Sequence, residues 1–322
     1  MSENDQVAAI IVTFNRLGEL KRALARLRQQ TRKLDEIIVV DDGSADGTRG
    51  WLAAQRDVVV IHQANLGPGV GFGVGLKTAI RRGAEWCWCL DDDVCAAPNA
   101  LEELCKAIEL RPDARVFNSI SLAENNPGHF AVGGLNVRTN PEDFLFGRSV
   151  RTLDELLPYL DANGMVDSIG GHFYHGSLLH RSVVETVGVP VEWMFIRGEE
   201  VEYTLRIMQC GYHIFSVARS VVYHPEIPGV TLRVFAKSKS FKTSTAQKRY
   251  YDLRNIVWIR RTYYAGYPLL PYLARRLGGA LLTELMLIRN KPWRERLACS
   301  RAAVRGLWDG WHIRAPNESQ PG

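Results

Sequence analysis

Residues Glu85–Val94 read EWCWCLDDDV, and this stretch decides the fold that we expect. Its first half, WCWCL, is an apolar run with the length and composition of a buried strand, and it ends abruptly in Asp91, Asp92 and Asp93. Carboxylates are tolerated at the carboxyl edge of a parallel sheet, where α/β proteins bind their ligands. Aspartates one residue apart can share a divalent cation that also binds phosphate oxygens. The stretch therefore predicts a metal and diphosphate site, with an acidic turn before a helix as the alternative.

The composition is that of a globular protein: 322 residues, 46% hydrophobic and 23% charged, enough for one large domain or two smaller ones. We find no charged-then-apolar leader before the first expected strand, and no apolar run near the ~20 residues that cross a bilayer. The sequence thus predicts a cytoplasmic protein. The spacing of the six cysteines is typical of free buried thiols, with a metal at Cys87, Cys89 and Cys95 as the weaker alternative.

Charge is distributed unevenly along the chain. Residues 231–322 carry 18 lysines and arginines against five aspartates and glutamates, which leaves 22 against 30 for residues 1–230. We therefore expect two parts, a catalytic domain at 1–230 and a basic loop with amphipathic helices at 231–322. The basic part indicates an anionic partner, either nucleic acid or phospholipid headgroups.

The first hundred residues alternate between strand and helix patterns. Apolar runs at Val7–Phe14, Glu36–Val40 and Val58–His62 predict strands, and the helix between the first two gives a βαβ unit with a parallel sheet. The glycine-rich stretch Asn65–Gly75 is expected to be a loop that leads into a helix at Leu76–Arg82. It follows the third strand and lacks a terminal Gly-Lys-Ser/Thr, so its pattern does not indicate dinucleotide binding.

Four motifs together resemble the nucleotide-sugar domain of an inverting family 2 glycosyltransferase of the GT-A fold. They are, in order, IVTFNR at 11–16, IIVVDDGSADGT at 37–48, NLG at 65–67 and LDDDV at 90–94. Later segments extend the resemblance over most of residues 7–310. These are GGHFYHGSLL at 170–179 for the acceptor side, FIRGEEVEYTLRIMQCG at 195–211 for the catalytic base, VVYHP at 221–225 for a late histidine, and KRYYDLRN at 248–255.

The resemblance implies an α/β fold of the GT-A type, a Rossmann-like mixed sheet flanked by helices, with a C-terminal helical extension. Within the family the chain looks most like bacterial galactofuranosyltransferases of cell-envelope galactan synthesis. That implies transfer of galactofuranose from UDP-galactofuranose to a lipid-linked or growing cell-envelope or O-antigen glycan. Two alternatives stay open: a rhamnosyl- or other hexosyltransferase that uses a dTDP- or UDP-sugar, and a non-catalytic nucleotide-sugar-binding module.

By this resemblance a divalent ion, Mn²⁺ or Mg²⁺, would be held by Asp91, Asp93 and His224. A histidine ligand favours manganese. The nucleotide-sugar would contact residues at the ends of the strands and in the glycine-rich stretch, with Asp41 on the uracil or ribose: Thr13, Phe14, Asn15, Asp41, Asn65, Gly67, Asp91 and Asp92.

The general base is expected in the EEVE sequence at 199–202, which opens a helix that ends near Gly211. We assign the base to Glu200, with Glu199 beside it. The alternative is that these acids only complement the helix dipole. For the acceptor side we expect Tyr174 and Trp193 to offer an apolar wall for a sugar ring, with core packing as the alternative. His175, Lys248 and Arg254 complete the predicted acceptor set.

The basic C-terminal part predicts contact with a membrane surface. Residues 237–249 are expected to form a phosphate-seeking loop, and residues 267–288 are apolar but interrupted by charges, which indicates an amphipathic helix at the interface. We therefore expect an enzyme peripherally associated with the inner face of the cell membrane. Packing on the catalytic domain or on a second subunit, giving a homo-oligomer, is the alternative. A nucleic-acid partner is not expected, because no recognition motif is found and the acidic sheet edge repels a polyanion.

Overall fold

The computed structural model describes residues 5–140, 143, 145–169, 172–225, 229–234, 237–242 and 244–314. For residues 229–234 and 237–242, and at Arg289, it describes the backbone alone. The chain divides into two compact units. The first comprises Met1–Phe195 and Glu199–Glu226, and the second comprises Ile196–Gly198 and Ile227–Gly322.

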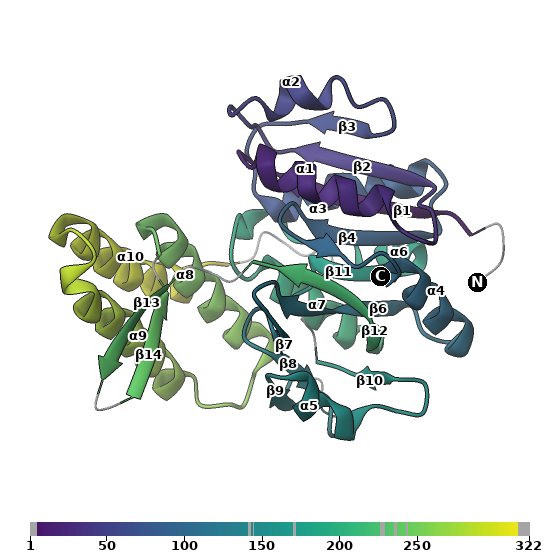
Figure 1. The fold of residues 1–322 in the computed structure, drawn as a ribbon. Coiled ribbons are helices and arrows are strands. Elements are labelled where there is room, and N and C mark those ends of the chain that lie inside the picture. Colours follow the sequence, from purple (N-terminus) through teal and green to yellow (C-terminus); the bar gives the residue numbers. More distant parts are fainter. Residues whose placement is uncertain are drawn as a thin grey trace. The chain divides into compact units, whose positions relative to one another are not determined.

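The first unit is built on one ten-stranded mixed sheet (Figure 1). Its strands are β1 (Val7–Thr13), β2 (Glu36–Asp41), β3 (Val59–His62), β4 (Trp86–Asp91), β5 (Cys95–Ala96), β6 (Val116–Ala123), β7 (Asn126–Phe130), β10 (Met165–Asp167), β11 (His175–His180) and β12 (Ile214–His224). The main order is β10-β12-β6-β11-β4-β1-β2-β3, with β5 on β12 and β7 on β6. The βαβ prediction and the buried WCWCL strand are confirmed, and so is the mixed α/β sheet of the GT-A type.

The strand order explains where the acids gather. Strands β2, β1 and β4 are parallel neighbours, and the chain adds strands on one side of β1 before it crosses to β4 on the other side. Such a reversal opens a crevice at the carboxyl ends of the two strands. Register pairs Thr13 with Asp41 and Val12 with Asp91. The ends of β1, β2 and β4 therefore lie on one edge of the sheet.

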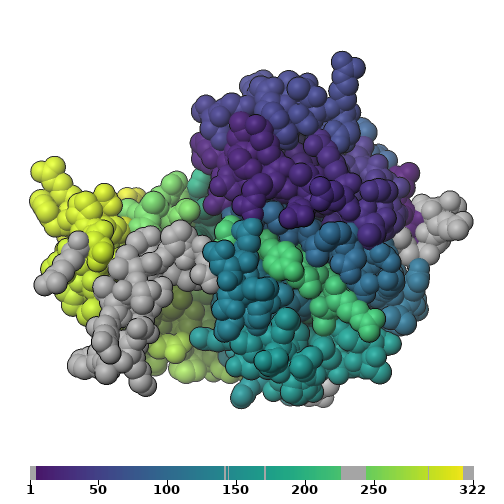
Figure 2. All heavy atoms as spheres, in the orientation of Figure 1, coloured from purple at the N-terminus to yellow at the C-terminus, as the bar shows by residue number. Residues whose placement is uncertain are grey.

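Helices cover both faces of this sheet. On one face α1 (Leu17–Arg28) and α4 (Ala100–Leu110) bury leucines in the core cluster that contains the odd-numbered residues of β1. The outward side of α1 forms part of the surface of the first unit (Figure 2). The other face carries α3 (Pro68–Arg81), with α6 (Arg181–Val187) and α7 (Glu199–Gln209) further along the chain. The unit is completed by α2 (Thr48–Leu52), α5 (Leu153–Leu156), the short helices η1 (Leu157–Tyr159) and η2 (Glu192–Met194), and the two-stranded sheet of β8 (Leu135–Val137) and β9 (Arg148–Val150).

The glycine-rich stretch is helical, so our prediction of a loop at Asn65–Gly75 was wrong. Pro68 starts α3, and the glycines after it form the first half of the helix. A Cβ atom at Gly71 would lie 2.6 Å from Val12 Cγ1, and one at Gly75 would collide with Ile10. Here glycine serves close packing of a helix on a strand, and that packing outweighs the low helix propensity of glycine.

The second unit is mainly helical. It contains α8 (Ala246–Tyr263), α9 (Leu269–Met286), η3 (Leu287–Arg289) and α10 (Trp293–His312). Gly306 and Gly310 bring α10 close to α8, since a Cβ at Gly306 would lie 2.5 Å from the Tyr250 carbonyl oxygen. None of the helices in the described residues is long and apolar enough to cross a membrane.

The basic stretch at the start of this unit differs from the loop that we expected. Its backbone forms an antiparallel pair, β13 (Gly229–Val234) and β14 (Lys237–Lys242), and α8 begins soon afterwards at Ala246. The side chains of these strands lie outside the described residues, so the expected binding of phosphate by this stretch stays a prediction.

Candidate active site

The acid triplet lies where β4 ends. Asp91 is the last residue of β4, and Asp92 and Asp93 form the turn toward β5. The Thr13 hydroxyl donates to Asp92 Oδ2 at 2.8 Å, and Arg16 Nη1 donates to Asp92 Oδ1 at 3.2 Å and also to Asp93. Asp92 is thus a buried acid that ties the end of β1 to the end of β4. We did not predict Arg16, although it is the cation in the IVTFNR motif.

The triplet places three carboxyl groups next to one another at a position that little solvent reaches. Partial burial, together with the charges of Asp93 and Glu200, raises the pKa of Asp91 well above its usual value. Burial raises the pKa of Asp92 to about 6, although Arg16 and Thr13 oppose the change. One arginine therefore does not neutralise the group, and a further cation would be stabilised beside it.

The two glutamates that begin α7 differ in exposure. Glu199 is 3% exposed and packs against α3, where a Cβ at Gly69 would lie 3.2 Å from its Cγ. Glu200 keeps 26% of its side chain exposed. Both carboxylates act electrostatically on Asp91, which brings α7 and the end of β4 into one acidic cluster. Accessibility favours Glu200 as the group that meets a substrate.

Three imidazoles line this cluster, and each faces a different acid. The His172 and His175 rings stack at 4.8 Å between centroids, and His175 and His224 stack at 4.3 Å. His172 Nδ1 lies 3.8 Å from Glu200 Oε1 and His175 Nε2 lies 3.7 Å from Asp91 Oδ2. His224 Nε2 lies 3.4 Å from Asp93 Oδ1. Burial lowers the pKa values of His175 and His224, and His172 is a site residue that the sequence analysis missed.

The predicted metal ligands come together in part. Asp93 and His224 are neighbours, whereas Asp91 is directed toward His175. Within the residues that the structure describes, no three His, Cys, Asp or Glu side chains form a complete metal-binding group. The oxygen and imidazole donors nevertheless suit Mn²⁺ in type. Burial and the neighbouring carboxylates raise the pKa of Asp91, and a cation would favour its ionised form.

The predicted nucleotide-binding residues lie along the same strand ends. Phe14 is 43% exposed just after β1, and Asn15, with φ of 54°, accepts from the Ala45 amide through Oδ1. Asp41 is buried and is engaged by the Ser44 amide and by His62 Nδ1 at 3.0 Å. Its carboxylate therefore shapes the turn after β2.

Asn65 and Gly67 lie just before the start of α3. Asn65 is exposed, whereas the Gly67 amide donates to Asp42 Oδ2 at 3.0 Å. The buried Asp42 carboxylate also accepts from the Leu66 amide, and it thus fixes the backbone just before α3.

Two predicted acceptor residues, Tyr174 and His175, lie in the core. Tyr174 is 1% exposed and its ring stacks on Phe72 at 3.8 Å, so it offers no face to a sugar. The alternative of plain core packing applies to it. His175 is 5% exposed and its Nδ1 is bonded to the Ser121 hydroxyl at 2.9 Å, so it supports the site from within.

The remaining predicted acceptor residues lie on η2 and α8. Trp193 is half-buried in η2 of the first unit. Lys248 and Arg254 lie on α8 of the second unit, where the Arg254 guanidinium stacks over Tyr251 at 4.5 Å. An acceptor role for these three residues stays a prediction.

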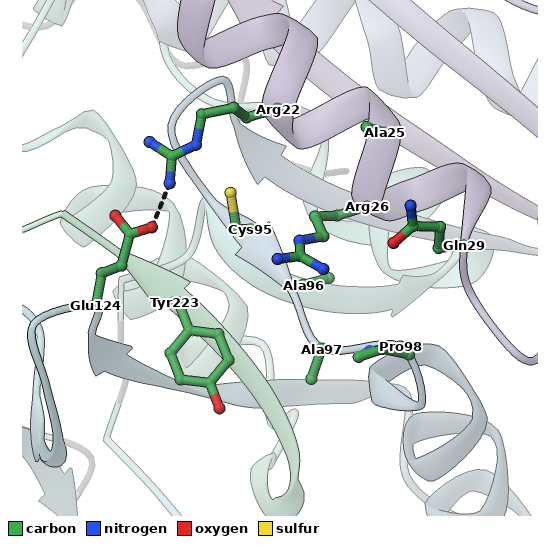
Figure 3. A pocket seen from close by; sticks show the side chains of 10 residues that line it. All are labelled: Arg22, Ala25, Arg26, Gln29, Cys95, Ala96, Ala97, Pro98, Glu124 and Tyr223. Atoms are coloured by element: carbon green, nitrogen blue, oxygen red, sulfur yellow. Dashed lines mark hydrogen bonds and ion pairs between the residues drawn. The ribbon is translucent and has the colours of Figure 1, made fainter.

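A pocket of about 600 Å³ lies elsewhere on the first unit (Figure 3). Arg22, Arg26 and Gln29 of α1 line it together with Cys95 and Tyr223, and Arg22 points to Glu124 and pairs with it. Its lining contains no member of the acidic cluster. The candidate active site is therefore the strand edge and not this pocket.

Comparison with known proteins agrees with the fold. The sequence pattern of glycosyl transferase family 2 matches residues 8–187, more than half of the chain. The chain therefore belongs to this family and is a glycosyltransferase with a GT-A fold and a C-terminal helical extension.

Among its relatives are mycobacterial galactofuranosyltransferases. GlfT1 of Mycobacterium tuberculosis H37Rv is 29% identical over 239 residues, which cover 69% of this chain and 70% of that protein. GlfT1 of Mycolicibacterium smegmatis is 28% identical over 233 residues, 70% of this chain and 72% of that protein. An undecaprenyl-phosphate mannosyltransferase of Micrococcus luteus is 32% identical over 108 residues, 32% of this chain and 44% of that protein.

A solved structure extends the likeness in fold. The crystal structure of S. aureus TarS has a TM-score of 0.51 and 14% sequence identity, and covers 94% of this chain. This chain spans about half of TarS, 54% of its length.

Proposed function

We propose that this glycosyltransferase moves galactofuranose from UDP-galactofuranose to a lipid-linked cell-envelope glycan, with inversion at the anomeric carbon. The observation that supports this most is the acidic cluster, in which the Asp91–Asp93 turn and the Glu199–Glu200 pair meet at the carboxyl edge of the sheet. The donor sugar is taken from the similarity to the two GlfT1 proteins.

In this proposal Glu200 is the general base. It is the more exposed glutamate, and a base must be reachable by the acceptor hydroxyl. The hydroxyl oxygen attacks the anomeric carbon from the face opposite the diphosphate, so configuration inverts. Asp91, Asp93 and His224 would hold Mn²⁺ or Mg²⁺, whose charge would stabilise the departing diphosphate. Thr13 and Arg16 hold Asp92 and thereby fix the turn that carries these ligands.

The nucleotide would lie along the ends of β1 and β2. Phe14 presents an exposed ring there, and aromatic rings stack on bases. Asn15 and Asn65 are exposed polar side chains at the same edge and are suited to hydrogen bonds with ribose or uracil.

Donor choice provides the direct test. With Mn²⁺ present, we expect UDP-galactofuranose to raise Tm more than UDP-galactopyranose, dTDP-rhamnose or GDP-mannose, and to be hydrolysed slowly to UDP without acceptor. Stabilisation by dTDP-rhamnose alone would move the proposal to a rhamnosyltransferase. Binding of UDP-sugars without any turnover would favour the non-catalytic module.

We further propose that α10 brings the enzyme to an anionic membrane surface. Trp293, Leu297, Val304, Trp308 and Trp311 are all at least 40% exposed, and their spacing puts them on one stripe of the helix. The exposed Arg294, Arg301 and Arg305 flank this stripe. An apolar stripe with tryptophans beside arginines is typical of helices that lie in the headgroup region.

Vesicle sedimentation tests the membrane proposal. The intact protein should pellet with vesicles that contain phosphatidylglycerol at low salt and should be released as salt rises, because charge and burial each contribute only part of the binding. Trp293→Gln combined with Trp308→Gln should abolish pelleting. Leu157→Gln, which removes an equally exposed apolar residue of the first unit, is the control and should pellet normally. Equal pelleting of all three proteins would contradict this role for α10.

A further inference from the structure

We propose that His172 is a positioning residue for the base Glu200, and that it accepts the hydrogen bond that Glu200 acquires when it takes up the acceptor's proton. This inference rests on the proposed function. It starts from one contact, His172 Nδ1 at 3.8 Å from Glu200 Oε1, in a ring that is 28% exposed.

The tautomer of His172 follows from its other nitrogen. Nε2 lies 2.6 Å from the carbonyl oxygen of Val132. A carbonyl oxygen only accepts, so Nε2 carries the hydrogen. In the neutral ring Nδ1 then carries a lone pair and no hydrogen, and this atom faces Glu200. Stacking on His175 fixes the plane of the ring from the side.

This arrangement suits the protonated base better than the resting one. A lone pair on Nδ1 and a carboxylate oxygen cannot form a hydrogen bond, which agrees with a separation longer than hydrogen-bonding distance. Once Glu200 carries a proton, its O–H can donate to Nδ1. The contact is therefore stronger after proton transfer than before it, and an interaction of that kind raises kcat without tightening substrate binding.

The step balances without a further reactant. The acceptor O–H bond breaks, its electron pair forms the new bond to the anomeric carbon, and UDP leaves with the electrons of the old C–O bond. The proton passes to Glu200 Oε1 and is shared with His172 Nδ1. It returns to solvent before the next turnover.

The neighbouring histidines have other partners. His175 Nδ1 is bonded to Ser121 and His175 Nε2 faces Asp91, while His224 faces Asp93. Of the three stacked rings, His172 is the one that faces Glu200. A matched pair exists on the surface of the same unit, where His213 Nδ1 lies 2.6 Å from Asp167 Oδ2.

The test compares single-turnover transfer from UDP-galactofuranose in His172→Gln, His172→Asn, Glu200→Gln and the double variant His172→Gln with Glu200→Gln. Glutamine has a donor at the position of Nε2 for Val132 but no acceptor at Nδ1, so the rate should fall about 10- to 100-fold with the donor KM and Tm unchanged. Asparagine has a carbonyl oxygen at the position of Nδ1 and should recover part of this loss. The control His213→Gln should transfer at the wild-type rate.

The double-mutant comparison separates positioning from general structural support. If His172 acts through Glu200, the double variant should be no slower than Glu200→Gln alone. Additive losses of transfer rate in the double variant, or a higher donor KM in His172→Gln, would overturn the inference. Loss in Glu200→Gln with full activity in His172→Gln would overturn this inference and leave the proposed function standing. Full activity in both single variants would contradict the assignment of the base itself.

Discussion

Glu200→Gln should lower the rate of sugar transfer by roughly 10²–10⁴-fold, the range expected for loss of a general base. The substitution keeps the size of the side chain and its place at the start of α7 and removes only the proton acceptor. Donor affinity should hardly change, because Glu200 is assigned to the acceptor and not to the nucleotide. Single-turnover kinetics and calorimetry with UDP measure the two quantities.

Glu199→Gln is the matched control for this prediction. Glu199 is buried against α3, so its substitution should act on stability more than on the chemical step. If Glu199→Gln were inactive with the Tm of the wild type and Glu200→Gln were active, the general base would have to be assigned to Glu199.

Asp91→Asn should have two opposite effects, which makes it a demanding test of the acidic cluster. It removes a proposed metal ligand, so the Mn²⁺-dependent affinity for UDP should fall by about 100-fold or more. In the metal-free protein it also removes a carboxylate that lies among Asp93, Glu200, Asp92 and Glu199. The metal-free variant should therefore be more stable than the wild type near pH 7.

The pH dependence of this gain follows from the raised pKa of Asp91. A carboxyl group with a raised folded pKa contributes stability below its unfolded pKa, near 4, and that contribution is lost as pH rises through the folded pKa. Asparagine does not titrate, so the difference in Tm should be close to zero near pH 4 and should grow toward neutral pH. A variant that is less stable than the wild type at pH 7 without metal would refute the crowding of charge at this edge.

The position of the site could be predicted from the sequence because it depends on strand direction. Runs such as VAAIIVT and WCWCL end in polar residues, and the carboxyl ends of parallel strands meet at one edge. The start of α7 was predicted from helical spacing and its acidic first turn. These rules place backbone elements and the residues at their ends.

The contacts that complete the site could not be predicted in this way. Arg16 is bonded to carboxylates more than seventy residues away, and His172 faces Glu200 through a ring orientation fixed by Val132. Periodicity does not indicate which side chains meet over such distances. The helical glycines of α3 and the buried ring of Tyr174 were mispredicted for the same reason, since their environment comes from Val12, Ile10 and Phe72.

The most direct measurement is the anomeric configuration of the product formed from UDP-galactofuranose and a polyprenyl-diphosphate-linked glycan acceptor, read by NMR. The proposed function predicts transfer of galactofuranose with a configuration opposite to that in the donor, and no product with Glu200→Gln over the same time. Transfer with retained configuration, or equal product from wild type and Glu200→Gln, would contradict single displacement with Glu200 as the base.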